Sequence, residues 1–336
     1  MNTAIKITAF IEKYDFARPF AISRGVITSL NVIVVEASRN GRTGRGEAVP
    51  MGSRVLSAEQ DRVAAQEALN LFHAVRPRVM ARPSRDQLYD LLPAGAVRNA
   101  IDCALWDLEA KESGHSIWRL TGIARPDHLV TAYTLSLASP AEMAAQARDH
   151  SDKQLLKLKL GGEGDIERVT AVAKAAPRAD IIVDANEAWS MAELEYFAPR
   201  FAEAGVRMIE QPLPAGRDHE LAGYRPPLPL CADESCHVTD DLDEIADRYQ
   251  MINIKLDKTG GLTEALRLAR AAQERNLDLM VGCMVGTSLS MAPGMVIGAL
   301  SRFVDLDGPL LLAGDHKDGI TYRGSVMECP AARLWG

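Results

Sequence analysis

The amino-acid sequence predicts an α/β fold, an eight-stranded parallel barrel preceded by a smaller α+β domain. From about residue 129, short apolar runs rich in β-branched residues alternate with helical stretches. The polar residue or glycine that ends each run recurs at steps of 25, 26, 23, 22, 27 and 23 residues. Each step has room for one strand and one crossover helix, as a parallel barrel requires. A doubly wound open sheet is the alternative that this spacing leaves open.

The expected strands each end in, or are followed directly by, a polar residue or a glycine. They are residues 129–134, 154–159, 180–184, 206–210, 228–232, 251–255, 278–282 and 302–307. Ser139 and Ser190 each precede a glutamate by three residues, which predicts a capping box at the start of a helix. Asp165 is expected to cap its helix in the same way. Residues 279–300 carry no charge, but Pro293 and four glycines favour a buried strand, turn and helix over a membrane span.

The first part of the chain lacks this rhythm. Two strand-like runs joined at a turn precede helices near 58–75 and 97–112, which indicates an α+β domain. We therefore predict an α+β capping domain over residues 1–120, with 315–336 packing back on it. The barrel domain is predicted over residues 121–314.

Composition excludes few functions but weighs against several. The formal net charge is −7 and the chain has no block of Lys or Arg, which disfavours a nucleic-acid or anionic-membrane partner. The five cysteines are odd in number and scattered, and the N-terminus shows no secretory signal pattern. These features predict a cytoplasmic protein with reduced thiols. The oligomeric state is left open, a homo-oligomer included.

Three acidic residues fall at the ends of consecutive predicted strands: Asp184, Glu210 and Asp233. Neighbouring strands lie about 4.8 Å apart, so these carboxylates would crowd together and repel one another. A hard divalent cation relieves that repulsion, and Mg²⁺ prefers oxygen ligands. We predict one Mg²⁺ per subunit at this edge. Zinc is disfavoured because Cys231, Cys236 and neighbouring His237 lack the spacing of a zinc site.

Two lysines flank the acids in the predicted order of strands. Lys159 ends the second strand and Lys255 the sixth, and these strands lie on opposite sides of an eight-stranded barrel. One lysine could remove a proton beside a carboxylate while the other donates to the opposite face. Lys157 shares a face with Lys159 and is expected to lower its pKa. Lys258 lies three residues past the strand and is the less preferred base.

The chain resembles the muconate-lactonizing subgroup of the enolase superfamily over nearly its whole length. The resemblance rests, in order, on "KLKLGG", "DANEAW", "EQPLP", "ADES" and "NIKLDKTGG". It implies a modified (β/α)7β TIM-type barrel with a capping domain, and Mg²⁺ bound by the three acids. It also implies acid/base roles for Lys159 and Lys255. Sites of that superfamily use a lysine or histidine base, and Mg²⁺ stabilises the enediolate.

Within the subgroup the chain is most similar to dipeptide epimerases. "FVDLDGP" places Asp305 and Asp307 on one face of the eighth strand, where such a pair holds a free α-ammonium group. The resemblance implies two-base 1,1-proton transfer at the α-carbon of the C-terminal residue of a dipeptide, expected to be L-Ala-D/L-Glu from cell-wall (peptidoglycan) peptides. Arg24, in the capping domain, is expected to bind the side-chain carboxylate of glutamate. Gly286 is expected to leave room in the site.

Other functions remain open at this point. The same site could carry o-succinylbenzoate synthesis, N-acylamino acid racemisation or cycloisomerisation, whose substrates lack the free ammonium group. A dipeptide epimerase of different side-chain specificity would share every motif. A non-catalytic barrel that binds a metal or small molecule would not need two opposed lysines.

Overall fold

The barrel is built from strands that follow one another around the sheet in chain order. The computed structural model describes residues 4–22, 25–50, 57–81 and 84–336, so Arg24 lies outside the described residues. Eight parallel strands form the sheet: β5 (Tyr133–Leu135), β6 (Leu155–Lys159), β7 (Asp180–Asp184), β8 (Val206–Glu210), β9 (Leu230–Ala232), β10 (Met251–Ile254), β11 (Asp278–Val281) and β12 (Phe303–Val304). Seven of them lie within the predicted strands. The predicted strand 129–134 is wrong as a single strand, because it divides into β4 (His128–Val130), which belongs to a separate sheet, and β5.

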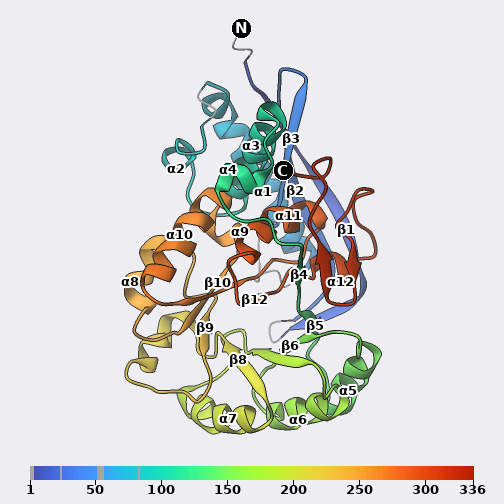
Figure 1. Cartoon of the computed structure of the whole chain (residues 1–336), viewed down its shortest axis with the longest axis vertical. Helices are drawn as coiled ribbons and strands as arrows, with labels where there is room; N and C mark the ends of the chain where they lie inside the picture. Colours follow the sequence, from blue (N-terminus) through green and yellow to red (C-terminus); the bar gives the residue numbers. More distant parts are fainter. Residues whose placement is uncertain (1–3, 23–24, 51–56, 82–83) are drawn as a thin grey trace.

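The strands of this sheet follow one another in chain order (Figure 1), and a short contact between its two ends closes it into a barrel. Thr131, just before β5, forms a parallel bridge with Val304 of β12. The backbone N–H of Ala132 donates to the carbonyl of Val304 at 2.7 Å. This seam decides between the two predicted architectures, because an open doubly wound sheet has no contact between its first and last strands.

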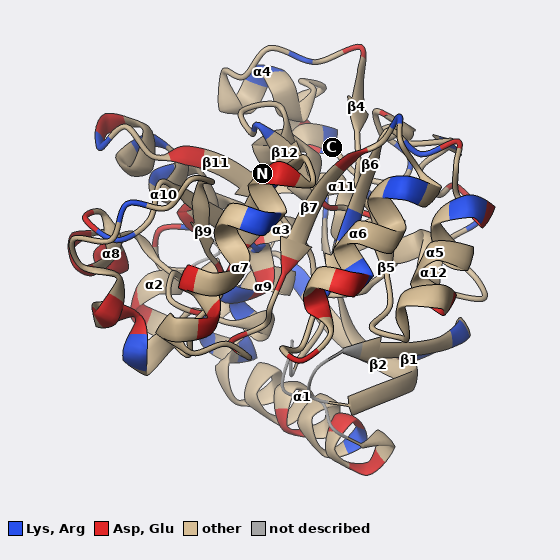
Figure 2. Cartoon of the chain, turned by 90° about the horizontal axis from the view of Figure 1, so that it is seen from below, with Lys and Arg blue, Asp and Glu red and all other residues tan. Residues whose placement is uncertain are grey.

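Helical segments follow the strands on the outside of the barrel. They are α5 (Pro140–Asp149), α6 (Asp165–Ala175), α7 (Met191–Glu203), η2 (Ala215–Leu221), η3 (Thr239–Asp241), α8 (Leu242–Ile245), α9 (Leu256–Thr259), α10 (Leu262–Glu274), α11 (Ser288–Gly298) and α12 (Gly308–Leu311). The eighth strand is followed by the four-residue helix α12 in place of a full crossover helix, as the (β/α)7β pattern implies. On the ribbon, basic and acidic residues are interspersed over α5, α6 and α7 (Figure 2).

The predicted helix starts are confirmed at two positions and wrong at a third. Ser139 and Ser190 both form capping boxes. Asp165 is the first residue of α6 rather than its cap, which is Gly164. The carboxylate of Asp165 instead accepts hydrogen bonds from the backbone N–H of Gly161 and Gly162, at 2.6 Å to the latter. The side chain therefore orders the loop after β6 rather than the helix.

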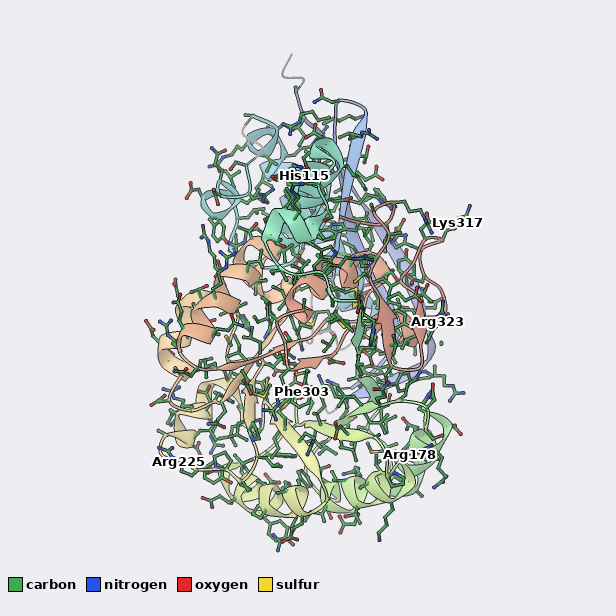
Figure 3. The ribbon with its side chains drawn as sticks, in the orientation of Figure 1. His115, Arg178, Arg225, Phe303, Lys317 and Arg323 are labelled. Carbon is green, nitrogen blue, oxygen red and sulfur yellow. The ribbon has the colours of Figure 1, made fainter. Side chains whose placement is uncertain are left out.

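Apolar side chains fill the barrel below its mouth. One buried cluster takes a residue from, or next to, each strand: Ala132, Leu155, Ile182, Met208, Cys231, Met251, Met280 and Phe303. Phe303 lies centrally within the barrel, whereas Arg178 and Arg225 lie at its periphery (Figure 3). The uncharged segment is the buried β11 and α11 with a turn between them, as predicted. Within the described ranges, no helix is long and apolar enough to cross a membrane.

The N-terminal part is an antiparallel sheet covered by helices. Its elements are β1 (Lys6–Ile22), β2 (Gly25–Arg39), β3 (Arg42–Ala48), α1 (Ala58–Ala81), α2 (Leu88–Leu91), α3 (Ala96–Ser113) and α4 (Ile117–Thr121). Helix α3 packs very closely on β3, since a Cβ at Gly44 would lie 2.2 Å from the carbonyl oxygen of Ala104. The β1–β2 hairpin reaches the barrel mouth, where Leu137 N–H donates to the carbonyl of Ala21 at 3.1 Å.

The C-terminal residues contact both parts of the molecule. β13 (Tyr322–Arg323) and β14 (Val326–Glu328) form a small antiparallel sheet with β4 (His128–Val130). Beyond it, the indole N–H of Trp335 donates to the carbonyl of Cys103 in α3 at 3.0 Å. The division into a capping domain of 1–120 with 315–336 and a barrel of 121–314 stays a prediction.

Candidate active site

The predicted acids meet at one edge of the barrel because the parallel strands keep them in register. Lys159 on β6 pairs with Asp184 on β7, and Asp184 pairs with Glu210 on β8. Asp233 follows β9 directly, and Lys255 follows β10. The three acids are at most 1% exposed. Around the mouth the order is therefore a lysine, three carboxylates and a second lysine.

The two lysines each bind the acid nearest to them. Lys159 Nζ donates to Asp184 Oδ2 at 2.6 Å, and Lys255 Nζ donates to Asp233 Oδ2 at 2.6 Å. Both lysines are buried, and both line the cavity described below. Burial alone would lower the pKa of Lys255, but the charges of Asp233 and Glu210 outweigh it and raise that pKa.

Lys157 lies inside the carboxylate cluster. Its ammonium nitrogen is 2.7 Å from Glu210 Oε2, 2.7 Å from Asp305 Oδ2 and 3.2 Å from Asp184 Oδ2. Burial opposes its charge, yet these three carboxylates raise its pKa well above the usual value. The ammonium group thus offsets the negative charge of the carboxylate cluster. The sequence predicted that Lys157 lowers the pKa of Lys159, but it did not predict these contacts with three carboxylates.

Lys258 is held behind Asp233 rather than directed at the cavity. Its ammonium group donates to Asp233 Oδ1 at 2.6 Å and to the carbonyl oxygens of Asp233, Cys236 and Asn253 at 2.5, 2.9 and 3.0 Å. Four such contacts leave it no room to act as a base. Lys255 lines the cavity and Lys258 does not, and the role of Lys255 as a base stays a prediction.

Asn253 is a site residue that the sequence reasoning missed. Its Nδ2 donates to Glu210 Oε1 at 2.7 Å, which fixes the central acid. The signal in the sequence was weak but present, because Asn253 precedes Lys255 by two residues on the same strand face.

The donor set fits a hard divalent cation. Burial and the charge of Asp184 raise the pKa of Glu210 to about 7. Burial also opposes the ionisation of Asp184, but Lys159 and Lys157 lower its pKa to about 2. A cation among these oxygens would relieve the repulsion that Glu210 experiences. Among the described residues, no group of three or more His, Cys, Asp or Glu side chains is arranged to hold a metal ion. Lys157, Lys159 and Lys255 instead form ion pairs with the three acids.

The two aspartates of the eighth strand have different partners. Asp305 pairs with Lys157, and its Oδ1 is buried without a hydrogen-bond partner. Asp307 Oδ2 accepts a hydrogen bond of 2.7 Å from the backbone N–H of Thr134. Burial and the charge of Asp305 raise the pKa of Asp307 to about 7. Two crowded carboxylates with spare acceptor capacity suit a cationic ligand group.

A cavity of about 100 Å³ lies between the barrel mouth and the N-terminal sheet. Seven polar residues form its floor: Lys157, Lys159, Lys255, Asp305, Asp307, Asn186 and Thr134. The remaining lining is largely apolar: Phe16, Phe20, Ile27, Leu30, Val49, Cys283, Met284, Val285 and Leu311. Asp61 also lines it and accepts a hydrogen bond from the backbone N–H of Asn31 at 2.8 Å. An apolar wall with a few convergent polar groups is the character of a small-molecule site.

The expectation about Gly286 is wrong. A Cβ at this position would lie 2.5 Å from Ser290 Oγ and 3.1 Å from Glu47 Oε1. The space is filled by side chains that the sequence places 4 and 239 residues away. Gly286 therefore permits close packing rather than leaving the cavity wider.

Comparison with known families agrees with this geometry. Residues 141–331 match the enolase C-terminal domain-like family. Residues 4–122 match the N-terminal domain family of mandelate racemase and muconate lactonizing enzyme. The chain belongs to the enolase superfamily. The resemblance and the barrel fold predicted from its motifs are thereby confirmed.

Two relatives of this chain are named for different activities, a racemase and an epimerase. It is 47% identical over 253 residues to an N-acetyl-D-glutamate racemase of Pseudoalteromonas, covering 74% of this chain and 79% of that protein. It is 40% identical over 318 residues to L-Ala-D/L-Glu epimerase of Escherichia coli, covering 94% and 97%. A crystal structure from Agrobacterium tumefaciens, an enolase family member with homology to dipeptide epimerases and with bound sodium and L-Ala-L-Glu, superposes with a TM-score of 0.93. That pair shares 44% identity over 99% of this chain and 100% of the other.

Proposed function

We propose that this protein is a Mg²⁺-dependent dipeptide epimerase that acts on L-Ala-D/L-Glu. The observation that carries the proposal is the order of side chains around the mouth: Lys159, then the three acids, then Lys255. A substrate carboxylate held at the acids would have its α-carbon between two lysines. One lysine would take the α-proton, and the other would deliver a proton to the opposite face, which inverts the centre.

Asp184, Glu210 and Asp233 would hold the metal ion. When bound, the cation supplies charge stabilisation to the substrate carboxylate as the α-proton leaves. Lys157 would then no longer be the main counter-charge of Glu210 and Asp184, and it would be free to donate toward the substrate carboxylate. Relatives of known structure are complexes with Mg and a dipeptide, which supports the same assignment here.

The two ends of the substrate would be recognised separately. Asp305 and Asp307 would bind the free α-ammonium group of the N-terminal residue. Three cationic side chains line the described part of the cavity, and all three are lysines of its floor: Lys157, Lys159 and Lys255. From its place in the capping-domain sequence, and because a guanidinium group pairs with a carboxylate in two hydrogen bonds, Arg24 is proposed to bind the glutamate side chain. We place the reaction in the cytoplasm, in the metabolism of cell-wall peptides.

The test is α-proton exchange in D₂O. NMR of L-Ala-D-Glu with the protein and Mg²⁺ should show loss of the α-proton signal and growth of the L,L diastereomer. Lys159→Ala and Lys255→Ala should each abolish epimerisation, while each retains exchange from one diastereomer only. Normal epimerisation by both variants would refute the two-base mechanism.

The Pseudoalteromonas relative favours a second candidate, the racemisation of N-acetylglutamate. This substrate offers the same α-proton and side chain but has no free ammonium group. Asp305→Asn separates the two candidates, because it removes a negative charge that only the dipeptide needs. If the protein is a dipeptide epimerase, kcat/KM for the dipeptide should fall by about tenfold or more. Activity on N-acetylglutamate that survives the substitution, with no activity on the dipeptide, would favour the second candidate.

A further inference from the structure

The end of β3 is fixed to the barrel by an acid of the loop that follows β10. Val49 comes directly after this strand, is buried and lines the cavity. Its backbone N–H donates to Asp257 Oδ1 at 3.0 Å. Asp257 belongs to α9, the short helix whose N-cap is Lys255. One hydrogen bond thus joins the roof of the cavity to the helix that begins at a proposed catalytic lysine.

Glu47 fixes the same end of β3 to the neighbouring loop. This side chain is 1% exposed. Its Oε1 accepts from the backbone N–H of Thr287 at 2.8 Å, and its Oε2 accepts from the Thr287 hydroxyl at 2.5 Å. Thr287 is the N-cap of α11 and follows Met284 and Val285, which line the cavity. The glutamate therefore anchors one wall of the cavity to its roof.

The surroundings leave both acids little freedom to shift. Asp257 Oδ1 also accepts from Asn99 Nδ2 at 3.0 Å, which adds a contact to α3. Glu47 packs against Gly286, where an added Cβ would come within 3.1 Å of its carboxylate. Neither acid is among the residues that line the cavity. Any effect on substrate must act through the backbone that they hold.

We propose that Glu47 and Asp257 are positioning residues: together they clamp residues 47–49 between the β10 and β11 loops and so set the shape of the dipeptide subsite formed by Val49, Met284 and Val285. The proposal rests on the proposed function for the identity of the ligand. It adds a determinant of substrate affinity that lies outside the metal, lysine and ammonium sites. It also predicts that conservative and truncating substitutions of these two acids behave differently.

The experiment compares Asp257→Ala with Asp257→Asn in the full-length protein. Asparagine keeps an oxygen acceptor for Val49 N–H, whereas alanine removes it. Hydrogen exchange of the Val49 amide should accelerate about tenfold or more in the alanine variant and stay within about twofold of the wild type in the asparagine variant. The Kd for L-Ala-L-Glu, measured by calorimetry with Mg²⁺ present, should weaken by about tenfold in the alanine variant only. Glu47→Ala and Glu47→Gln should repeat this contrast at the Thr287 amide.

Tyr89→Phe is the matched control. Its hydroxyl donates to Glu264 Oε2 at 2.9 Å, which also joins the N-terminal part to the barrel, and neither residue lines the cavity. This variant should bind the dipeptide like the wild type. Unchanged Val49 exchange in Asp257→Ala, or faster exchange with unchanged dipeptide affinity, would overturn the proposal, as would equal weakening by Tyr89→Phe. A wild-type protein that binds no dipeptide, while Val49 exchange still accelerates in Asp257→Ala, would refute the proposed substrate and support the clamp.

Discussion

Lys157→Met tests whether one ammonium group holds the carboxylate cluster together without a metal ion. The substitution keeps the apolar stem but leaves Glu210, Asp305 and Asp184 without a charge that lies 2.7 to 3.2 Å from them. Breaking a buried ion pair by removing one partner costs about 3–5 kcal/mol. For 336 residues the unfolding entropy is about 0.7 kcal/mol per degree, so the midpoint should fall by about 4 to 7 °C.

The assay is calorimetric unfolding in EDTA and again with excess Mg²⁺. Because a divalent cation can replace the missing charge, Mg²⁺ should raise the midpoint of the variant by more than that of the wild type. Lys13→Met is the control, since the side chains of Lys13 and its partner Asp15 are 62% and 70% exposed, and exposed pairs contribute at most about 1 kcal/mol. A Lys157→Met midpoint within about 1 °C of the wild type in EDTA would refute the electrostatic reasoning.

Three further predictions concern separate parts of the molecule. Burial raises the pKa of Asp102 to about 6 in the folded state, above its usual value of 3.8, so the unfolded chain loses its proton first. Stability should therefore fall by about 3 kcal/mol as the pH rises from about 4 to about 6, and Asp102→Asn should lack that fall in urea unfolding. Arg24→Met should lower kcat/KM for L-Ala-D-Glu by about tenfold but leave L-Ala-D-Gln nearly unaffected; an equal loss on both would exclude recognition of the side-chain carboxylate. Gly286→Ala should cost about 1–3 kcal/mol because its Cβ would contact Ser290 and Glu47, whereas Gly216→Ala, with nothing within 4 Å of its Cβ, should unfold like the wild type.

The sequence predicts the barrel and its polar mouth because both depend on local periodicity. Lys159, Asp184, Glu210 and Asp233 each end an apolar run, and parallel strands then bring them to one edge. Arg24 could be predicted but not placed, since it lies outside the described residues.

Contacts between distant segments could not be predicted in this way. Glu47 and Thr287 are 240 residues apart, and no repeat or motif links them. The close packing at Gly286 depends on that contact, so the expectation of open space there failed for the same reason. Asp165 was misassigned because a capping pattern shows where a helix starts but not which backbone N–H its first acid will bind.

Residues of the proposed site also hold together the two ends of the barrel sheet, which gives them a role in folding. The bridge between Thr131 and Val304 joins residues 173 positions apart, and two contacts of the proposed site cross it. Asp307 reaches Thr134, and Asp305 reaches Lys157. Because contacts over long sequence separations form slowly, closure of this seam should be a late step in folding. Asp305 and Asp307, the aspartates proposed to bind substrate, would then also stabilise the closed barrel. Substitutions at either residue should therefore change the unfolding rate as well as the affinity for a dipeptide.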